Sequence, residues 1–546
     1  MRKLLSLIFL FAAGPVLAAP AETVTFTPST RTVDAYDFVE VVIRVAAPAS
    51  VNPFTGVTVT GEFQRKGAAP MPVDGFCDAA DGSLFRIRFM PSQPGSYDYT
   101  VKYQRGDVAQ THNGSFMARK GTRRGGVRVD KNYPWHFVWE GTGEHYFWNA
   151  TTTYALMGWK DDAIIRESID RLARLKVNRL RVAIIPPRVE SGQQWYEPMV
   201  VTNDQFTFRL NAWMAARPDS LDDPGFDVTR FNVEYWQKYE RMLRHAREKN
   251  IAVSVIFYVD GRLPGVDPFK KERMGGEDEQ RYYRYAAARL AAYANVMWDV
   301  SNEYRHFRDD AWAEKIGAFL KDCNPYDHLT SIHGHGDFRF MKSPWADFAM
   351  YQSWDEHGGY KFMLKNREKQ AATGRPMPQV NEEYGYEDHY PGPWGEGRKW
   401  PARIADSRRR LAWEMYMAGG YQTTGERANS PRTGGWINGR GDEQMTMLIG
   451  YGHIYDFFMR TEWWKTAPNN ALVDGDNLCL AEPGRQYIVY LPKGGKVMVK
   501  LEPGNYRASR YDPLTGKLSE IGDVTGGPWT APESHPQQDW VLWIRT

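Results

Sequence analysis

The first hundred or so residues alternate between apolar and polar positions in short runs. Residues 38–45, 57–60, 85–89 and 97–101 each show a period of two, and Gly and Pro separate the runs. Successive side chains of a strand point to opposite faces, so this pattern is typical of strands with one buried face. Many such strands with turn residues between them predict a β-sandwich over residues 19–120.

The pattern changes after a Gly- and Arg-rich linker at residues 121–126. Apolar runs of strand length now alternate with segments of helical period, such as Ile165, Ile169 and Leu172 behind a capping Asp162. This alternation predicts βα units. Eight strands are expected, at residues 145–151, 177–185, 251–258, 295–301, 327–333, 347–352, 376–382 and 419–425.

Eight strands over about 300 residues predict an α/β fold, a (β/α)8 TIM barrel over residues 121–470. An open, doubly wound sheet is the alternative, but no glycine-rich phosphate turn opens a helix here. Towards the C-terminus, strand-like alternation returns in residues 487–491, 497–501 and 540–544. This predicts a second, small β-sandwich over residues 471–546.

The N-terminus has the three parts of a secretory signal. Arg2 and Lys3 precede an apolar run at residues 4–13, and small residues up to Ala18 form a cleavage site. A membrane anchor is the alternative, but the run is far shorter than the ~20 residues that span a bilayer. We expect cleavage after Ala18, which removes residues 1–18, and a periplasmic or secreted protein without a membrane span.

Composition narrows the classes of partner. With 69 Lys and Arg against 66 Asp and Glu, the formal net charge of +3 gives no sign of nucleic-acid binding. The three cysteines are an odd number, one in each predicted domain, which favours free thiols over a disulfide framework. No Cys-x-x-Cys spacing is present, and no cofactor is expected. The 20 Trp and 30 Tyr would suit the apolar faces of sugar rings. The sequence does not indicate an oligomeric state.

Two segments place a carboxylate at the end of a predicted strand. Residues 298–304 and 379–387 lead from apolar runs into Asn-Glu elements that contain Glu303 and Glu383. Their separation, 383 − 303 = 80 residues, fits three βα units of roughly 25 to 30 residues. Barrel enzymes place their chemistry at these strand ends. Because hydrolysis of a glycosidic bond needs two carboxyl groups, the sequence predicts an enzyme that cleaves a poly- or oligosaccharide.

These motifs resemble the clan A retaining glycoside hydrolases. Asn302-Glu303 is similar to the Asn-Glu at the end of strand four, and Glu383-Tyr384-Gly385 to the motif at the end of strand seven. The segment 178–181, Asn-Arg-Leu-Arg, is similar to the Asn-x-x-Arg pattern of strand two. Tyr386-Glu387 resembles the sequence that follows the strand-seven Glu in the apiosidase-like group of bacterial glycosidases.

The flanking segments resemble modules found beside such barrels. The N-terminal part is similar to an uncharacterised β-sandwich that precedes the barrel in many bacterial glycoside hydrolases, although Cys77 stands where that module usually has an aromatic. The C-terminal part is similar to a module named for collagen binding that commonly ends sugar-cleaving barrels. The matching segments are residues 52–54, 74–78, 88–91, 94–97, 481–484, 511–516 and 539–542.

The resemblance implies a role for each matching residue. Glu303 would be the acid/base and Glu383 the nucleophile of a retaining hydrolysis. For this, Glu303 needs a pKa raised by an apolar surround and by the nearby carboxylate, while Glu383 stays ionised. Asn302 would hydrogen-bond the sugar hydroxyl next to the anomeric centre. Arg181 would hold the nucleophile ionised and oriented.

Some of these assignments have open alternatives. Adjacent residues of a strand face opposite ways, so Glu382 could face the site in place of Glu383. Arg181 could instead be an ion-pair partner in the barrel core. The histidines of residues 331–335 could suggest a metal pair, but no carboxylate cluster accompanies them in the sequence, and no metal is expected. Further substrate contacts are expected from His335, Gln352, Trp354 and Trp436.

Two other functions fit part of this pattern. A non-catalytic carbohydrate-binding protein would not need two carboxylates at strand ends. A polysaccharide lyase would use a Tyr, His or Lys base, usually beside a basic patch, and the near-neutral charge disfavours it. The sequence leaves the sugar, its linkage and its anomeric configuration open.

Overall fold

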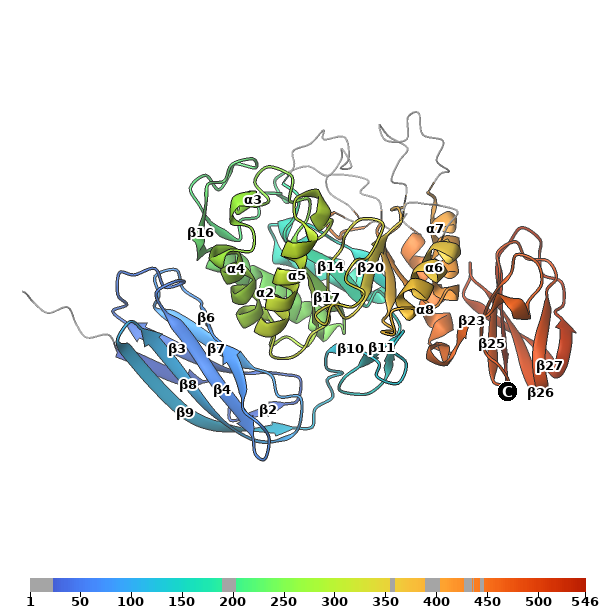
Figure 1. Ribbon diagram of the computed structural model, residues 1–546, viewed down its shortest axis with the longest axis horizontal. Helices are drawn as coiled ribbons and strands as arrows, with labels where there is room; N and C mark the ends of the chain where they lie inside the picture. The colour runs from blue at the N-terminus through green and yellow to red at the C-terminus, as the bar shows by residue number, and fades with distance from the viewer. Residues whose placement is uncertain are drawn as a thin grey trace, which may run out of the picture.

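The computed structural model describes residues 23–188, 203–353, 359–387, 403–426, 435, 437–441 and 446–546. These residues form an N-terminal β-sandwich, a central barrel and a C-terminal sheet, arranged in that order along the molecule (Figure 1). The predicted signal segment lies outside the described residues. Among the residues described, every helix falls short of the length and apolar character that crossing a bilayer requires.

Two mainly antiparallel sheets make the N-terminal sandwich, as the alternation predicts. Val39, Val41 and Ile43 of one sheet face inwards and are fully buried, and Phe63 of the other sheet stacks on Phe89 with ring centroids 4.5 Å apart. The first sheet has the order β1 (Thr23–Pro28), β3 (Val39–Ala46), β7 (Leu84–Phe89), β6 (Phe76–Cys77). The second has the order β2 (Thr32–Asp34), β9 (Val108–Arg119), β8 (Gly95–Arg105), β4 (Thr58–Arg65), β5 (Met71–Asp74), with β2 parallel to β9.

A small antiparallel sheet closes the amino-terminal end of the barrel. It has the order β10 (Val127–Val129), β11 (Phe137–Trp139), β12 (His145–Tyr146). Phe137 stacks on Trp148 at 4.9 Å and meets Phe348 edge-on, just before two barrel strands begin. The prediction of one strand at 145–151 is therefore wrong in part, because its first residues pair in this sheet and only the last ones enter the barrel.

Eight parallel strands form the barrel, which confirms the predicted fold class. Their order is β19 (Thr330–Ser331), β18 (Val296–Asp299), β17 (Ala252–Tyr258), β14 (Arg179–Ile185), β13 (Ala150–Thr152), β22 (Tyr421–Thr424), β21 (Gln379–Glu383), β20 (Ala349–Gln352). The ring is nearly closed between β19 and β20, where the Asp347 N–H donates to the Thr330 carbonyl at 2.8 Å. All eight strands fall within or beside the ranges that the sequence predicts.

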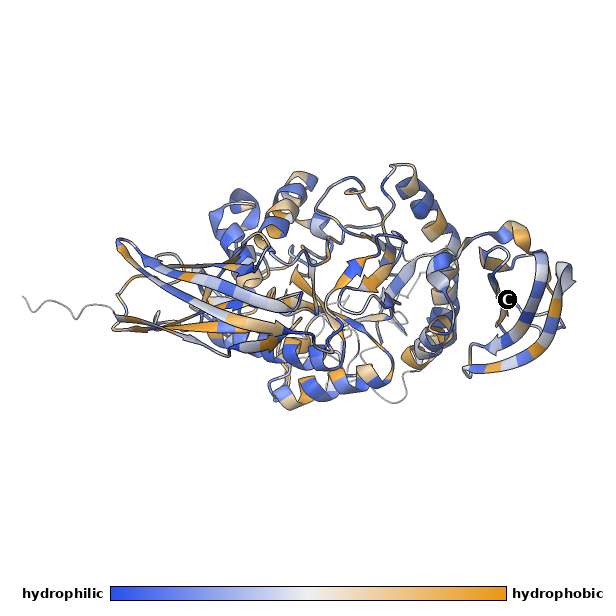
Figure 2. Ribbon diagram, turned by 90° about the horizontal axis from the view of Figure 1, so that it is seen from below, coloured by the Kyte–Doolittle hydropathy of each residue, from blue (hydrophilic) through white to orange (hydrophobic). Residues whose placement is uncertain are grey.

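Helices cover the outside of the barrel (Figures 1 and 2), and apolar side chains of the first two, among them Ile169 and Leu243, are fully buried. The first helix begins differently from the prediction, because Asp161, not Asp162, accepts the Ala163 N–H as its N-cap, while Asp162 pairs with Arg241. The α-helices are α1 (Asp162–Arg174), α2 (Val233–Glu248), α3 (Lys270–Arg273), α4 (Glu277–Leu290), α5 (Asp310–Cys323), α6 (Gly359–Ala371), α7 (Ala405–Met417) and α8 (Met447–Phe458). Other elements are the hairpin β15 (Trp213–Ala215) and β16 (Phe226–Phe231), and the 3-10 turns η1 (Leu156–Gly158), η2 (Tyr304–His306), η3 (Trp463–Lys465) and η4 (Asn470–Leu472).

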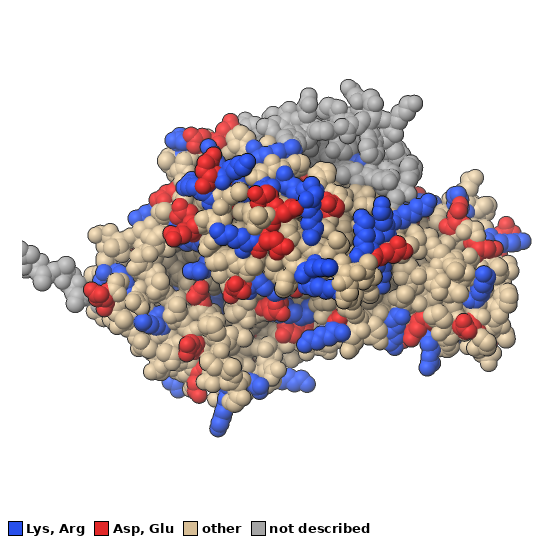
Figure 3. All heavy atoms as spheres, viewed as in Figure 1, with Lys and Arg blue, Asp and Glu red and all other residues tan. Residues whose placement is uncertain are grey.

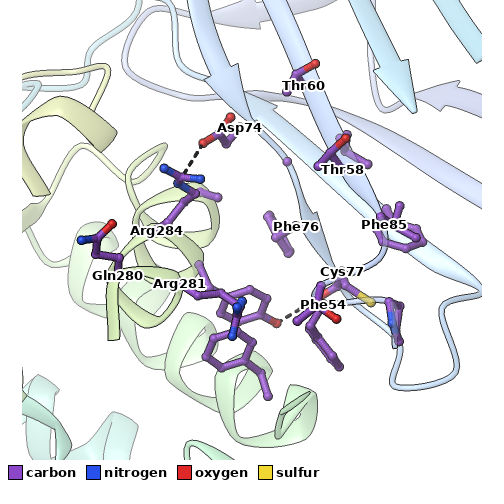
Figure 4. A pocket seen from close by; sticks show the side chains of 18 of the residues that line it. Phe54, Thr58, Thr60, Asp74, Phe76, Cys77, Phe85, Gln280, Arg281 and Arg284 are labelled. Carbon is purple, nitrogen blue, oxygen red and sulfur yellow. Dashed lines mark hydrogen bonds and ion pairs between the residues drawn. The ribbon is translucent and has the colours of Figure 1, made fainter. Parts of the chain in front are cut away.

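Buried ion pairs join the sandwich to the barrel. Arg88 of β7 lies 2.8 Å from Glu240 of α2, and Arg289 of α4 lies 2.6 Å from the same carboxylate. Beside them a cavity of about 510 Å³ separates α4 from the sandwich strands (Figure 4). Asp74 at its wall is ion-paired with Arg284 at 3.9 Å. We interpret this cavity as a seam between the two parts of the protein.

The C-terminal part encloses a core of its own within one bent, six-stranded antiparallel sheet. Only residues 507–511 of β26 pair with β28, while β26 and β27 pair over residues 498–512 with two register shifts. The part of this hairpin that does not pair with β28 therefore folds over Tyr487 and Val489, as the second layer of a sandwich does. The order is β23 (Ala467–Pro468), β24 (Leu478–Glu482), β25 (Gln486–Leu491), β28 (Trp540–Arg545), β26 (Met498–Asp512), β27 (Lys517–Thr530).

Charged side chains of both signs are interspersed over the face of the molecule shown in Figure 3. The three cysteines are free: Cys77 and Cys479 are buried, and Cys323 is half-buried.

Candidate active site

The carboxyl ends of the parallel strands bring the chemically active side chains together. Because all eight strands run the same way, their ends meet at one face of the barrel. The residues that collect there are Tyr154 after β13, Asn302 and Glu303 after β18, His333 and His335 after β19, Gln352 at the end of β20, and Glu383 and Tyr386 at and after the end of β21.

Glu303 stands in a strained turn. Its φ of 47° lies in the left-handed region, which a residue with a Cβ adopts at a cost of roughly 1–2 kcal/mol. The turn begins η2, in which residues three apart lie over one another, so that His306 comes beside Glu303 with Nε2 3.7 Å from Oε1. The Glu303 side chain is 15% exposed. Strain of this kind clusters at functional sites.

The neighbouring acids Glu382 and Glu383 have different surroundings. Glu382 is fully buried and lies 2.9 Å from Nη1 of Arg179 and 3.6 Å from Nε of Arg181. Glu383 is 8% exposed, and the hydroxyl of Tyr154 donates to its Oε2 at 3.3 Å. A register shift between β20 and β21 sets Glu383 opposite Gln352. Glu382 thus belongs to the barrel interior, and Glu383 to the site.

Gly385 shapes the chain just beyond β21. Its φ of 102° is a conformation that favours glycine, and a Cβ there would lie 2.7 Å from Nε of Arg403. The turn returns Tyr386 to the site, where its hydroxyl lies 3.5 Å from that of Tyr154 and helps to stabilise the Glu383 anion.

Asn302 is held by its amide oxygen. That oxygen accepts from Arg181 Nη2 at 2.8 Å and from the ring of His333, and it lies 3.3 Å from the Tyr154 hydroxyl. With the oxygen occupied, the amide nitrogen is the group that can donate to a ligand. Asn302 can therefore act as the predicted donor to a sugar hydroxyl.

Arg181 acts mainly in the barrel interior, the alternative left open by its sequence. It is fully buried and ion-paired with Asp299 at 3.2 Å as well as with Glu382. It contacts the site through Nη1, which donates to the Tyr154 hydroxyl at 3.2 Å, and through Nη2, which donates to Asn302 Oδ1 at 2.8 Å. Tyr154 in turn donates to Glu383, so Arg181 is a positioning residue for that carboxylate.

The two candidate catalytic carboxyls shift each other's protonation. Burial, and then the charge of Glu303, raises the pKa of Glu383 to about 8. Burial also opposes ionisation of Glu303, but the hydrogen bond and charge of His306, the charge of His335 and a hydrogen bond from Gln352 lower its pKa below the ordinary value. Two interacting carboxyls of this kind hold one proton over a wide pH range.

The expected pKa directions are therefore wrong for the ligand-free site. The sequence predicts a raised pKa for Glu303 and an ionised Glu383, whereas the pKa of Glu383 is raised and that of Glu303 is lowered. The physical reason is the placement of the basic side chains. Two histidines, one of them unforeseen, flank Glu303, while Arg181 forms its ion pairs with Glu382 and Asp299.

This proton makes the stability of the protein depend on pH. The pKa of Glu383 rises from 4.5 to about 8 on folding, so its favourable contribution is complete below pH 4.5 and is lost as the pH rises through 8. Glu383→Gln stays neutral at every pH. We expect the stability of Glu383→Gln relative to the unsubstituted protein to increase by more than about 1.4 kcal/mol, the equivalent of one pKa unit, between pH 5 and pH 8. Urea unfolding of both proteins at the two pH values measures this. An unchanged difference would contradict it.

The remaining predicted contacts divide into two groups. Gln352 contacts Glu303, and His335 is exposed beside His306, with ring centroids 5.5 Å apart. Trp354 and Trp436 lie outside the described residues. Sequence reasoning missed Tyr154 and His306. Tyr154 follows the first barrel strand by two residues, a position that could have been found from the strand assignment.

Among the described residues, one group of three His and acidic side chains could hold a metal ion: Glu303, His306 and His335. Of the two histidines in residues 331–335, only His335 belongs to this group, and a single carboxylate, that of Glu303, comes beside it from another strand end.

Two family models match the chain. One, described as the apiosidase-like catalytic domain, matches residues 136–425, which is 290 of the 546 residues (425 − 136 + 1). The other, a domain of unknown function named DUF5060, matches residues 32–104. No curated protein matches the chain.

Solved structures share the fold. A glycoside hydrolase candidate from Bacteroides vulgatus is 18% identical, with 94% of this chain and 100% of that chain covered and a TM-score of 0.75. A glycoside hydrolase family 5 protein from the same organism is 14% identical, with 77% and 93% covered and a TM-score of 0.61. Since the apiosidase-like model spans more than half of the chain, the protein belongs to the apiosidase-like family and is an enzyme with the glycoside hydrolase fold.

Proposed function

We propose that the protein is an exported retaining glycoside hydrolase, with Glu303 as the acid/base and Glu383 as the nucleophile. The observation that carries the proposal is the pair of electrostatically linked carboxyls, that of Glu303 just after β18 and that of Glu383 at the end of β21. Export rests on the signal-like residues 1–18. N-terminal sequencing of the exported protein should begin at Ala19, and an intact Met1 would contradict export.

In the first step Glu303 would protonate the leaving oxygen while Glu383 attacks the anomeric carbon and forms a glycosyl-enzyme ester. In the second step Glu303, now ionised, takes a proton from water while the water oxygen attacks the anomeric carbon and releases the Glu383 carboxylate. The amide nitrogen of Asn302 would donate to the neighbouring sugar hydroxyl.

Substrate binding would have to move the shared proton. In the ligand-free site the pKa of Glu383 is raised and that of Glu303 is lowered, whereas attack needs the proton on Glu303. A sugar that covers Glu303 excludes water from that carboxyl and favours its neutral form. The hydroxyls of Tyr154 and Tyr386 can then stabilise the charge on Glu383.

The stereochemistry of the product tests the retaining mechanism. Because the family is named for apiosidase activity, apiose-containing glycans are the first substrates to screen, followed by other plant, algal and microbial polysaccharides. Proton NMR during early turnover should show the substrate's anomeric configuration in the first product. An inverted anomer would overturn retention, and an unsaturated sugar product would indicate a lyase.

A further inference from the structure

The histidines beside Glu303 form a compact set of metal-binding groups. His306 follows β18 by way of η2, and His335 follows β19, so two strand ends deliver them independently. One ligand atom from each of Glu303, His306 and His335 lies within 4.8 Å of the others, and the Glu303–His306 pair is already at 3.7 Å.

These groups suit a zinc-like ion in kind and in spacing. Zn²⁺ binds imidazole nitrogen and carboxylate oxygen at about 2.0–2.2 Å, which places tetrahedral ligands about 3.4 Å apart. The widest separation in the cluster must therefore shrink by at most about 1.4 Å, from 4.8 Å to about 3.4 Å. His306 and His335 are both exposed, so their side chains can turn by this amount without repacking a core.

The surroundings favour a three-ligand site with an open position. Gln352 donates to Glu303 and can orient its carboxylate, as outer hydrogen-bond partners of metal ligands do. Three protein ligands leave the fourth tetrahedral position to water. Exposure of the two histidines gives an ion a path from solvent.

We propose that Glu303, His306 and His335 bind one divalent transition-metal ion of the Zn²⁺ type, reversibly, at the mouth of the barrel. A carboxylate that ligates the ion has no proton to donate, so the bound ion holds the enzyme inactive until it dissociates. This inhibition rests on the proposed role of Glu303, whereas binding does not.

Zinc titration of the metal-free full chain, without an added histidine tag, tests the site. Competition with a chromophoric chelator should show that one zinc ion binds tightly to each chain. His306→Ala and His335→Ala should each weaken this binding at least about tenfold. His535→Ala removes an exposed histidine from the C-terminal part and is the matched control. Equal affinity in the double variant His306→Ala/His335→Ala, or no tight ion in the unsubstituted chain, would overturn the proposal.

Two further measurements distinguish metal binding at this site from inhibition of the enzyme. Co²⁺ in place of Zn²⁺ should give the intense visible absorption of a four-coordinate ion, lost in the double variant. On a cleaved substrate, Zn²⁺ should inhibit the unsubstituted enzyme and a chelator should restore turnover, while the double variant resists inhibition. Binding without inhibition would retain the site and overturn the role of Glu303 as the acid/base.

Discussion

Glu383→Gln is expected to lower turnover at least about a thousandfold on any cleaved substrate. The amide keeps the shape of the carboxyl but cannot form the glycosyl-enzyme ester, and loss of a covalent nucleophile is among the largest single-residue effects in enzymes. Initial rates measured by release of reducing sugar give the ratio. The neutral amide replaces a carboxyl whose pKa is raised by burial and by the charge of Glu303, so the variant should fold at least as well as the unsubstituted protein.

Glu303→Gln separates the two roles through the leaving group. Loss of a general acid costs about 10²–10⁴ in rate when the leaving group needs a proton, and much less when it is an acidic phenol. We expect Glu303→Gln to lose more rate on a natural glycoside than on a nitrophenyl glycoside, whereas Glu383→Gln loses about the same on both. The reverse pattern would exchange the roles of the two residues. Full turnover in both variants would remove the pair from catalysis.

The strands of the barrel could be predicted because they are buried on both faces and bounded by turn residues. Residues 251–258 and 295–301 stand out as apolar runs for this reason, and β17 and β18 follow them closely. The division of residues 145–151 between two sheets could not be foreseen, because His145 and Tyr146 have the same strand-like pattern as the residues after them. The division follows from strand pairing, because His145 and Tyr146 pair with β11 whereas Ala150–Thr152 pair with β14.

The acid pair of the site could be predicted, but not its surroundings. Glu303 and Glu383 were identifiable by position at strand ends and by resemblance. The electrostatics depend on His306, which reaches Glu303 only because the turn at Glu303 has a positive φ. Likewise, Tyr154 acts through its contacts with Asn302 and Glu383, which follow it in the chain by 148 and 229 positions. Sequence periodicity carries no signal of such contacts.

Glu382→Gln is expected to destabilise the barrel, in contrast to Glu383→Gln next to it. Glu382 and Asp299 balance the charges of Arg179 and Arg181, and all four side chains are fully buried. Removal of one partner from a buried ion pair costs about 3–5 kcal/mol, because the remaining charge is left without compensation. Urea unfolding at a fixed pH should show a loss of this size.

A double variant shows whether charge balance is the cause. In Glu382→Leu/Arg179→Met one positive and one negative group leave together, while Arg181 keeps its ion pair with Asp299 at 3.2 Å. Replacement of a whole buried pair by apolar residues of similar size is often close to neutral, so most of the lost stability should return. If Glu382→Gln instead unfolds like the unsubstituted protein but loses turnover as Glu383→Gln is expected to, then Glu382 is the acid that faces the substrate. Comparing these two adjacent Glu-to-Gln changes therefore decides which carboxyl of β21 performs the chemistry.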